Sequence, residues 1–134
     1  MSTFVVTLLL VVSSCSFTKS KEIGERAVAQ FHDQFNAGKY HEIYSQSDEG
    51  FRKSTSEADT VALFDAVRRK LGTVKNAKQT TWYVNATPAG TKITLGYDVD
   101  FTDGKATEQF VCQVNGDKAS LFNYNVTSPL LITK

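Results

Sequence analysis

The stretch that decides the fold is TKITLGYDVDFTDGKATEQFVCQV, residues 91–114. In its first half apolar and polar residues alternate strictly, and the apolar face carries Ile93, Leu95, Tyr97, Val99 and Phe101. A period of two residues is typical of a β-strand that buries one face and exposes the other. Thr102-Asp103-Gly104 is a turn sequence, and residues 105–115 predict the returning strand. The stretch therefore predicts an antiparallel hairpin with one buried face.

Further strands flank this hairpin on both sides. Residues 75–85 are rich in Thr, Trp, Tyr and Val, and a turn sequence at residues 87–90 leads from them into the hairpin. After the hairpin, Asn115-Gly116-Asp117 predicts another tight turn, and residues 119–126 predict a further strand. Beyond Pro129, residues 130–132 predict a short edge strand. The four main strands follow one another along the chain, as they do in an antiparallel meander.

The part of the chain that precedes the strands has apolar residues at helical spacing. Residues 21–37 predict an amphipathic helix that ends at Gly38 and buries a stripe of Ile23, Ala27, Phe31 and Phe35. Residues 40–45 predict a short second helix, and residues 47–50 predict a turn.

A third helix is predicted to start at an N-cap, Ser54 or Ser56, and to end at Gly72. Its inward face is expected to carry Leu63, Phe64, Val67 and Leu71. Helices followed by a run of strands indicate an α+β fold, with N-terminal helices packed on a curved antiparallel sheet of about four strands.

Composition and charge narrow the functional classes. The 134 residues include 15 Lys and Arg against 14 Asp and Glu, so the net charge is +1, and the charges are spread evenly. Nucleic-acid binding needs a concentrated basic surface, and adhesion to an anionic membrane needs a polybasic patch. The sequence therefore argues against a nucleic-acid partner.

The chain opens with an apolar run, FVVTLLLVV, residues 4–12. A membrane-spanning helix needs about 20 apolar residues, so this run is too short to cross a bilayer. It also lacks the polar spacing of a helix in a globular core. Its length matches the apolar region of a secretory signal, and small residues follow it. Residues 1–14 are therefore predicted to be a signal peptide, and residues 22–134 a single domain.

The residues at the end of this run, Val12-Ser13-Ser14-Cys15, resemble the lipobox of bacterial lipoproteins. The resemblance implies that the chain is cut before Cys15, that the Cys15 thiol carries diacylglycerol, and that residues 15–21 are a tether. It also implies a place in the bacterial cell envelope facing the periplasm, and Ser16 favours the outer membrane. The start of the chain departs from the pattern because Met1-Ser2-Thr3 contains no Lys or Arg. An ordinary secretory signal with an incidental Cys15 is the alternative.

The order of elements resembles the nuclear transport factor 2-like superfamily, a cone-shaped, cystatin-like α+β fold. Residues 27–53, AVAQFHDQFNAGKYHEIYSQSDEGFRK, are similar to the opening of uncharacterised bacterial envelope proteins of that fold. The matching positions are Phe31, Phe35, Ala37, Gly38, Tyr40, Tyr44, Phe51 and Arg52. The stretches GYDVDF and ATEQFVCQV are similar to the family's central strands. The resemblance covers about residues 22–127 and implies a fold rather than an activity.

The candidate pocket residues are Glu108, Tyr97, Trp82, Phe110 and Tyr124. Glu108 shares a strand face with Phe110, where a desolvated carboxylate could act as a general base. The competing interpretation places Glu108 at the open end of the strand, in water. The aromatic residues either line a ligand pocket or form the core.

Two polar pairs have the same ambiguity. Asp98 and Asp100 could act as an acid–base pair or bind a cation, or they could form the solvent face of the sheet. Asn123 and Asn125 share a strand face. If that face points inward, the two side chains could form hydrogen bonds with a ligand.

Other motifs that carry chemistry are missing from the sequence. It has no Cys/His cluster, no phosphate-binding Gly loop, no dinucleotide fingerprint and no Gly-x-Ser-x-Gly. His32 and His41 fall on different predicted helices, and His32 is expected at the edge of the packed face. If Cys15 is lipidated, Cys112 is expected to be a buried lone thiol. No cofactor, metal or catalytic set is predicted.

These observations favour a non-enzymatic envelope lipoprotein that is anchored through Cys15 and binds a partner protein or a small apolar ligand. A second copy of the chain is a further candidate partner. The alternative is a small cone-fold hydrolase or isomerase with Glu108 or Asp98 as its base. A roomy pocket around Glu108 would favour the enzyme, and an interior filled by Phe and Leu would favour the binding protein.

Overall fold

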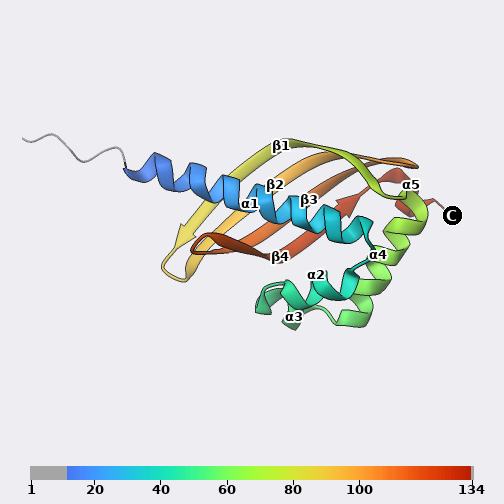
Figure 1. The fold of residues 1–134 in the computed structure, drawn as a ribbon, viewed down its shortest axis with the longest axis horizontal. Helices are drawn as coiled ribbons and strands as arrows, with labels where there is room; N and C mark the ends of the chain where they lie inside the picture. The colour runs from blue at the N-terminus through green and yellow to red at the C-terminus, as the bar shows by residue number, and fades with distance from the viewer. Residues whose placement is uncertain (1–11, 134) are drawn as a thin grey trace, which may run out of the picture.

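The computed structural model describes residues 12–133 of the chain. Over these residues, four helices precede four strands and a last short helix, and the N-terminal helix packs on the sheet (Figure 1). The predicted α+β fold is therefore confirmed. Residues 1–11 of the predicted signal peptide lie outside the described residues.

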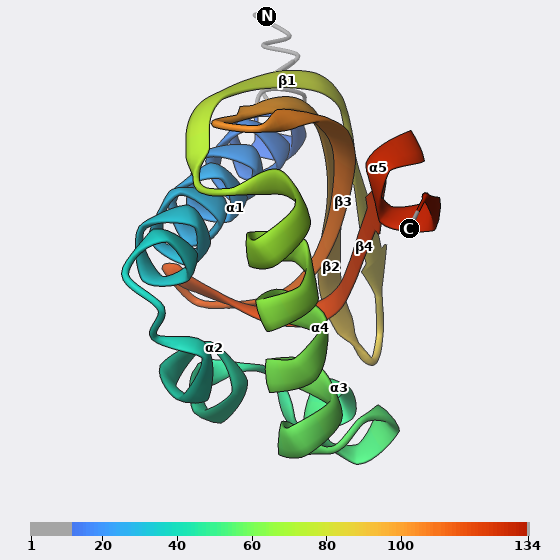
Figure 2. The same cartoon turned by 90° about the vertical axis from the view of Figure 1, so that its right-hand side faces the viewer.

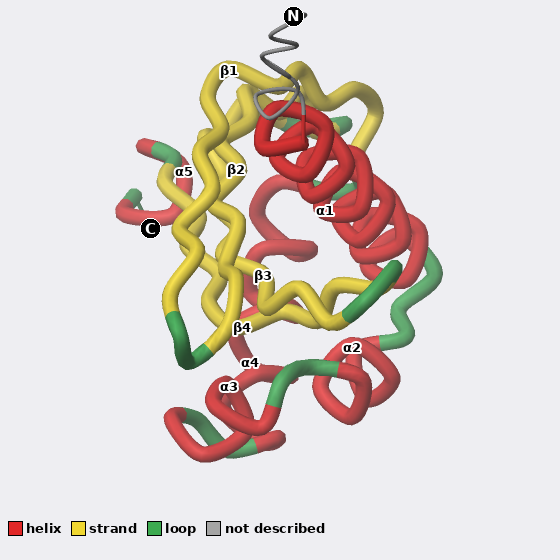
Figure 3. The backbone as a smooth tube through the Cα atoms, turned by 90° about the vertical axis from the view of Figure 1, so that its left-hand side faces the viewer, coloured by secondary structure: helices red, strands yellow, loops and turns green. Residues whose placement is uncertain are grey.

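The strands form one antiparallel sheet in the order β1-β2-β3-β4. Their bounds are β1 (Val74–Thr87), β2 (Gly90–Phe101), β3 (Gly104–Asn115) and β4 (Lys118–Thr127). Each strand pairs with its neighbour in sequence, and the hairpin closes with Phe101 opposite Gly104. The predicted meander is confirmed, and the sheet curves around the helix that packs against it (Figure 3).

The helix that fills the curve of the sheet is α1 (Val12–Asn36). It begins earlier than the expected start at residue 21, because the sequence from residue 12 to residue 23 contains no Gly or Pro to end a helix. The predicted tether, residues 15–21, is therefore helical. At the other end, the Asn36 side chain accepts a hydrogen bond from the Val74 N–H and donates one to the Val74 carbonyl. These two bonds fix the end of α1 to the start of β1.

Two short helices, α2 (Tyr40–Gln46) and α3 (Glu49–Ser54), follow α1. The prediction of a turn at residues 47–50 was wrong, because Asp48 is the N-cap of α3. Its side chain accepts a hydrogen bond from the Gly50 N–H at 2.8 Å. An Asp before a helix and an Asp in a turn make the same kind of bond to the backbone, so the sequence alone did not separate them.

The third predicted helix is α4 (Glu57–Leu71), and Ser56 rather than Ser54 is its N-cap. α4 stands beside the sheet, against the C-terminal end of α1 (Figure 2). Phe64, Val67 and Leu71 are buried as predicted, but Leu63 is 43% exposed. The buried stripe begins at Thr60 and runs at helical spacing through Phe64, so Leu63 lies on its flank.

The prediction of an edge strand at residues 130–132 was wrong, because this segment forms α5 (Pro129–Ile132). Pro129 stands at the first helical position, where its fixed φ suits a helix and its missing N–H costs nothing. Ser128 caps the helix by accepting from the Leu130 N–H, and its hydroxyl donates to the Lys105 carbonyl at 2.7 Å.

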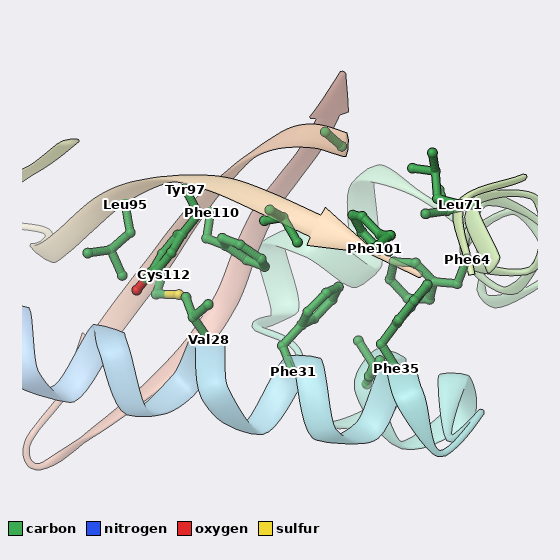
Figure 4. Packing of buried hydrophobic residues seen from close by; sticks show 14 of the residues in the cluster. Val28, Phe31, Phe35, Phe64, Leu71, Leu95, Tyr97, Phe101, Phe110 and Cys112 are labelled. Carbon is green, nitrogen blue, oxygen red and sulfur yellow. The ribbon is translucent and has the colours of Figure 1, made fainter. Parts of the chain in front are cut away.

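The interior between α1, α4 and the sheet is filled by aromatic rings (Figure 4). The Phe31 ring centre lies 5.0 Å from that of Phe110 and 5.5 Å from that of Phe64, both edge to face. Phe35 makes edge-to-face contacts with Phe64 and Phe101. Such pairs add about 0.5–1.5 kcal/mol each beyond the area that they bury.

A β-bulge in β4 decides which side chains reach this interior. Cys112 pairs with Leu121 and Val111 with Asn123, so Phe122 has no partner on β3. The extra residue allows Leu121 and Tyr124 to face inward together, although strict alternation would put them on opposite faces. A similar shift in β1 leaves Thr80 unpaired between Gln79 and Thr81.

Candidate functional site

A buried carboxylate lies at the centre of the sheet. Glu108 follows Ala106 and precedes Phe110 on the inner face of β3, and its side chain is 1% exposed. The interpretation that placed Glu108 in water is therefore wrong. A buried carboxylate is costly unless both of its oxygens find partners.

Both oxygens of Glu108 do have partners. Oε1 lies 2.7 Å from His32 Nε2, and Oε2 accepts a hydrogen bond from the Tyr124 hydroxyl at 2.5 Å. A proton must lie between His32 Nε2 and Glu108 Oε1 at this distance, since two lone pairs would repel each other. The three side chains form a network, which we call the His–Glu–Tyr cluster, and they come from α1, β3 and β4.

Aromatic rings exclude water from this cluster. The His32 ring has edge contacts with the rings of Phe31, Phe110 and Tyr97, at 5.9, 5.7 and 6.3 Å between centres. The Tyr124 ring packs on Phe31 and Phe110. Surroundings of this kind strengthen hydrogen bonds inside the network.

Burial raises the pKa of Tyr124 well above its ordinary value, and the neighbouring charge and hydrogen bond of Glu108 raise it further. Tyr124 therefore stays a hydroxyl that donates to Glu108. Burial also raises the pKa of Tyr97, whose hydroxyl lies 3.5 Å from Gln79 Nε2. Neither tyrosine is placed to lose its proton near neutral pH.

His32 is the member of the cluster that the sequence interpretation missed. It was expected at the edge of the packed face, but it is 8% exposed. The signal was available, because His32 comes four residues after the buried Val28 and so lies on the same helix face. The predicted buried stripe contained Phe31 and Phe35 but left out His32, which lies beside them.

The structure brings together four of the five candidate pocket residues and separates the fifth. Tyr97, Phe110 and Tyr124 surround Glu108, whereas Trp82 is 41% exposed near the N-terminal part of α1. The Lys21 Nζ lies 5.6 Å from the centre of its ring.

The polar pairs point away from the interior. Asp98 is exposed and Asp100 half-buried on the outer face of the sheet, where Lys105 Nζ lies 3.7 Å from Asp100 Oδ1. Asn123 and Asn125 are exposed on the same face. Within residues 12–133, no group of three or more His, Cys, Asp or Glu side chains is arranged to hold a metal ion.

The other titratable side chains are dispersed. His41 pairs with Glu57 at the surface, and the hydrogen bond that it donates to Glu57, followed by the charge of Glu57, raises the pKa of His41. Cys112 is buried as predicted, and burial raises the pKa of its thiol to about 12. A thiol held in this form is neither a nucleophile nor a metal ligand.

The hollows beside the cluster are small. One has a volume of about 50 Å³ and lies between α1, α2 and β4, with Phe31, Phe110 and Cys112 in its wall. The other has a volume of about 170 Å³ and is lined by Tyr124 and by residues of α3 and α4. Pockets for small ligands measure about 300–1,000 Å³. Glu108 and His32 line neither hollow. The geometry thus gives an internal network that can hold a proton and tie three elements together.

Among residues 12–133, no helix has both the length and the apolar character that crossing a bilayer requires.

The chain is similar to a protein family of unknown function. A family model described as "Protein of unknown function (DUF4019)" matches residues 26–122, a span that contains both His32 and Glu108. A search of curated proteins finds none that matches this chain.

Proposed function

The chain belongs to the DUF4019 family, whose function is unknown, and we propose that it is a non-catalytic binding domain of the bacterial cell envelope, anchored through a lipidated Cys15. The observation that carries the non-catalytic part is the filled interior. Aromatic rings occupy the space where an enzyme of this shape would hold its substrate, and the only carboxylate found there among the described residues uses both oxygens on the protein itself.

Accessibility supports this proposal over catalysis. A general base must come within hydrogen-bond reach of the proton that it removes. Glu108 is 1% exposed and His32 8%, and rings enclose both, so a substrate reaches them only if the core opens. Opening would cost the ring contacts of Phe31 and Phe110.

The fold supports a place in the nuclear transport factor 2-like superfamily. A long helix inside a curved antiparallel meander, with shorter helices at one end, matches the cone that the resemblance implies (Figure 2). The hollows of about 50 and 170 Å³ beside the cluster are too small for an enclosed ligand, which favours a partner protein at the surface over a small apolar molecule inside.

The lipobox supports the membrane anchor and the envelope location. Among the described residues the buried hydrophobic residues begin at Ile23, so cleavage before Cys15 removes none of them. The mature domain would keep its core and carry its lipid at the start of α1. Ser16 favours the outer membrane as the destination, with the domain facing the periplasm.

The test is metabolic labelling of cells with a fatty-acid analogue, followed by membrane fractionation. The Cys15→Ser variant is expected to lose both the label and the membrane association. Cys112→Ser is the matched control, because it removes the other thiol of the chain and keeps Cys15. A Cys15→Ser protein that still carries the label would overturn the anchor.

The alternative function is a small hydrolase or isomerase with Glu108 as its base, and the His–Glu–Tyr cluster is the observation that favours it. An envelope phenotype distinguishes the two functions. A binding protein keeps its phenotype in Glu108→Gln as long as the fold persists, whereas an enzyme loses it.

A further inference from the structure

The end of the molecule that carries Cys15 exposes aromatic side chains. Phe17 of α1 is 44% exposed, and Trp82 of β1 is 41% exposed. Tyr83, the next residue of β1, points to the opposite face of the sheet. Lys21 joins Phe17 and Trp82, because its Nζ lies over the Trp82 ring. Phe17 and Lys21 are four residues apart in one helix and therefore share a face. We call Phe17, Lys21 and Trp82 the aromatic strip.

α1 connects this strip to Cys15 without a flexible linker. Cys15 lies within the helix that begins at Val12. A rise of 1.5 Å per residue puts Lys21 about 9 Å from Cys15 along the helix axis. The helix is already buried at Ser20, which is 8% exposed. Whatever holds Cys15 therefore also holds the aromatic strip close by.

The backbone at the next turn of α1 fixes the helix to the sheet. A Cβ on Gly24 would lie 2.8 Å from Leu95 Cδ1, so the helix approaches the sheet as closely as a glycine allows. The contact packs the α1 backbone directly on the Ile93 and Leu95 side chains of β2. The strip and the anchor site thus lie on elements that pack against each other.

The start of α1 and the helices α4 and α5 lie at opposite ends of the molecule. The first turns of α1 project past the sheet on the side of the β1–β2 turn, while α4 and α5 lie at the other end (Figure 1). A surface that holds the lipid of Cys15 would face the strip and would lie away from Ile132 of α5.

We infer that the aromatic strip rests on the phospholipid surface into which the lipid of Cys15 inserts, an inference that rests on the proposed anchor. Trp is favoured where a bilayer meets water, and a Lys there lays its stem on apolar groups while its ammonium stays hydrated. A lipid surface is the occupant because the helical connection from Cys15 leaves only about 9 Å between anchor and strip.

The charges of this segment balance. Lys19 and Lys21 stand against Glu22 and Glu25, and Lys21 Nζ pairs with Glu25 Oε1 at 2.7 Å. The contact therefore does not need anionic lipids, and it forms on zwitterionic phosphatidylcholine and persists in high salt.

The chain's single tryptophan, Trp82, makes this contact measurable. The acylated protein is reconstituted into vesicles of phosphatidylcholine, with and without bromine on the acyl chains, and its emission is recorded. Contact shifts the emission to shorter wavelengths and causes loss of intensity on the brominated lipid. The matched control combines Trp82→Phe with Ile132→Trp, which moves the fluorophore to a side chain that is 84% exposed at the far end. The control is expected to show neither effect.

The possible outcomes test separately whether Cys15 anchors the protein and whether the aromatic strip contacts the lipid. An acylated protein that floats with the vesicles while Trp82 is unshifted and unquenched would overturn the contact and leave the anchor standing. Loss of a partner protein in Trp82→Ser, with no quenching by lipid, would assign the strip to that partner and would also overturn the contact. A native protein with an unmodified Cys15 would remove the anchor and, with it, the inference.

Discussion

His32 on α1 and Glu108 on β3 are 76 residues apart in sequence, and His32 Nε2 lies 2.7 Å from Glu108 Oε1 in the core. Tyr124 occupies the other carboxylate oxygen, so the network joins one helix to the two strands at the end of the sheet. These two hydrogen bonds make the buried Glu108 carboxylate compatible with an interior of aromatic rings.

The first prediction compares two replacements of Glu108. Glu108→Ala leaves His32 and Tyr124 without partners and is expected to lower the free energy of unfolding by about 3–5 kcal/mol. Glu108→Gln keeps the shape and one acceptor oxygen, so it is expected to cost only about 1–2 kcal/mol. Urea unfolding of the domain measures both. Equal costs for the two variants would show that the cluster contributes through its volume rather than through its hydrogen bonds.

A second prediction concerns alkaline pH. The pKa of the Cys112 thiol is about 12 against 9.0 for a free thiol, and the pKa values of Tyr97 and Tyr124 are raised above 10.0. The folded state therefore holds these protons more tightly than the unfolded state does. The resulting stability is complete below pH 9.0 and is lost as the pH rises through the raised pKa values.

Unfolding experiments between neutral pH and pH 10.0 check this direction. The free energy of unfolding is expected to start falling near pH 9.0, and the fall should be smaller in Cys112→Ala, which has no thiol to ionise. Stability that rises over this interval would contradict the assigned direction.

Chemical reactivity gives a third prediction. Because Cys112 is 2% exposed and its thiol keeps its proton, a disulfide reagent at mildly alkaline pH is expected to react very slowly with the folded domain. The measurement uses the Cys15→Ser background, so that Cys112 is the one remaining thiol. Unfolding in urea should restore full reactivity. Rapid reaction of the folded protein would show that the core opens often, as the enzymatic alternative requires.

The bulge in β4 supplies a fourth prediction. Deleting Phe122 removes the unpaired residue and leaves Leu121 and Tyr124 on the inner face, so the domain is expected to fold with reduced stability. Deleting Asn125 instead moves Val126 from the inner face to the outer face and is expected to prevent folding. Far-ultraviolet circular dichroism and thermal unfolding compare the two. The reverse order of tolerance would show that the strand register is set elsewhere.

β2 was predictable because its apolar and polar residues alternate without error from Ile93 to Phe101. The bulge at Phe122 was not, because an unpaired residue shows itself only against its partner strand. α3 and α5 were missed for a local reason. Each is a short helix of one or two turns, and its start, Asp48 or Ser128-Pro129, also fits a turn or a break between strands.

The candidate site was predictable in part. Glu108 was identified from its place among Ala106 and Phe110, and the same alternation placed Tyr97 on the inner face. Its partner His32 lies on another element, and no pattern within either segment links them. Trp82 was grouped with the other aromatic residues of the strands, but the edge of the sheet leaves it exposed beside Lys21.

We propose that this domain is held at the envelope membrane by Cys15. Mass spectrometry of the N-terminal peptide of the protein from its native cell tests that claim most directly. We expect a chain that begins at Cys15 and carries a diacylglyceryl group on its sulfur. A chain that still contains residues before Cys15, with an unmodified thiol at that position, would contradict it.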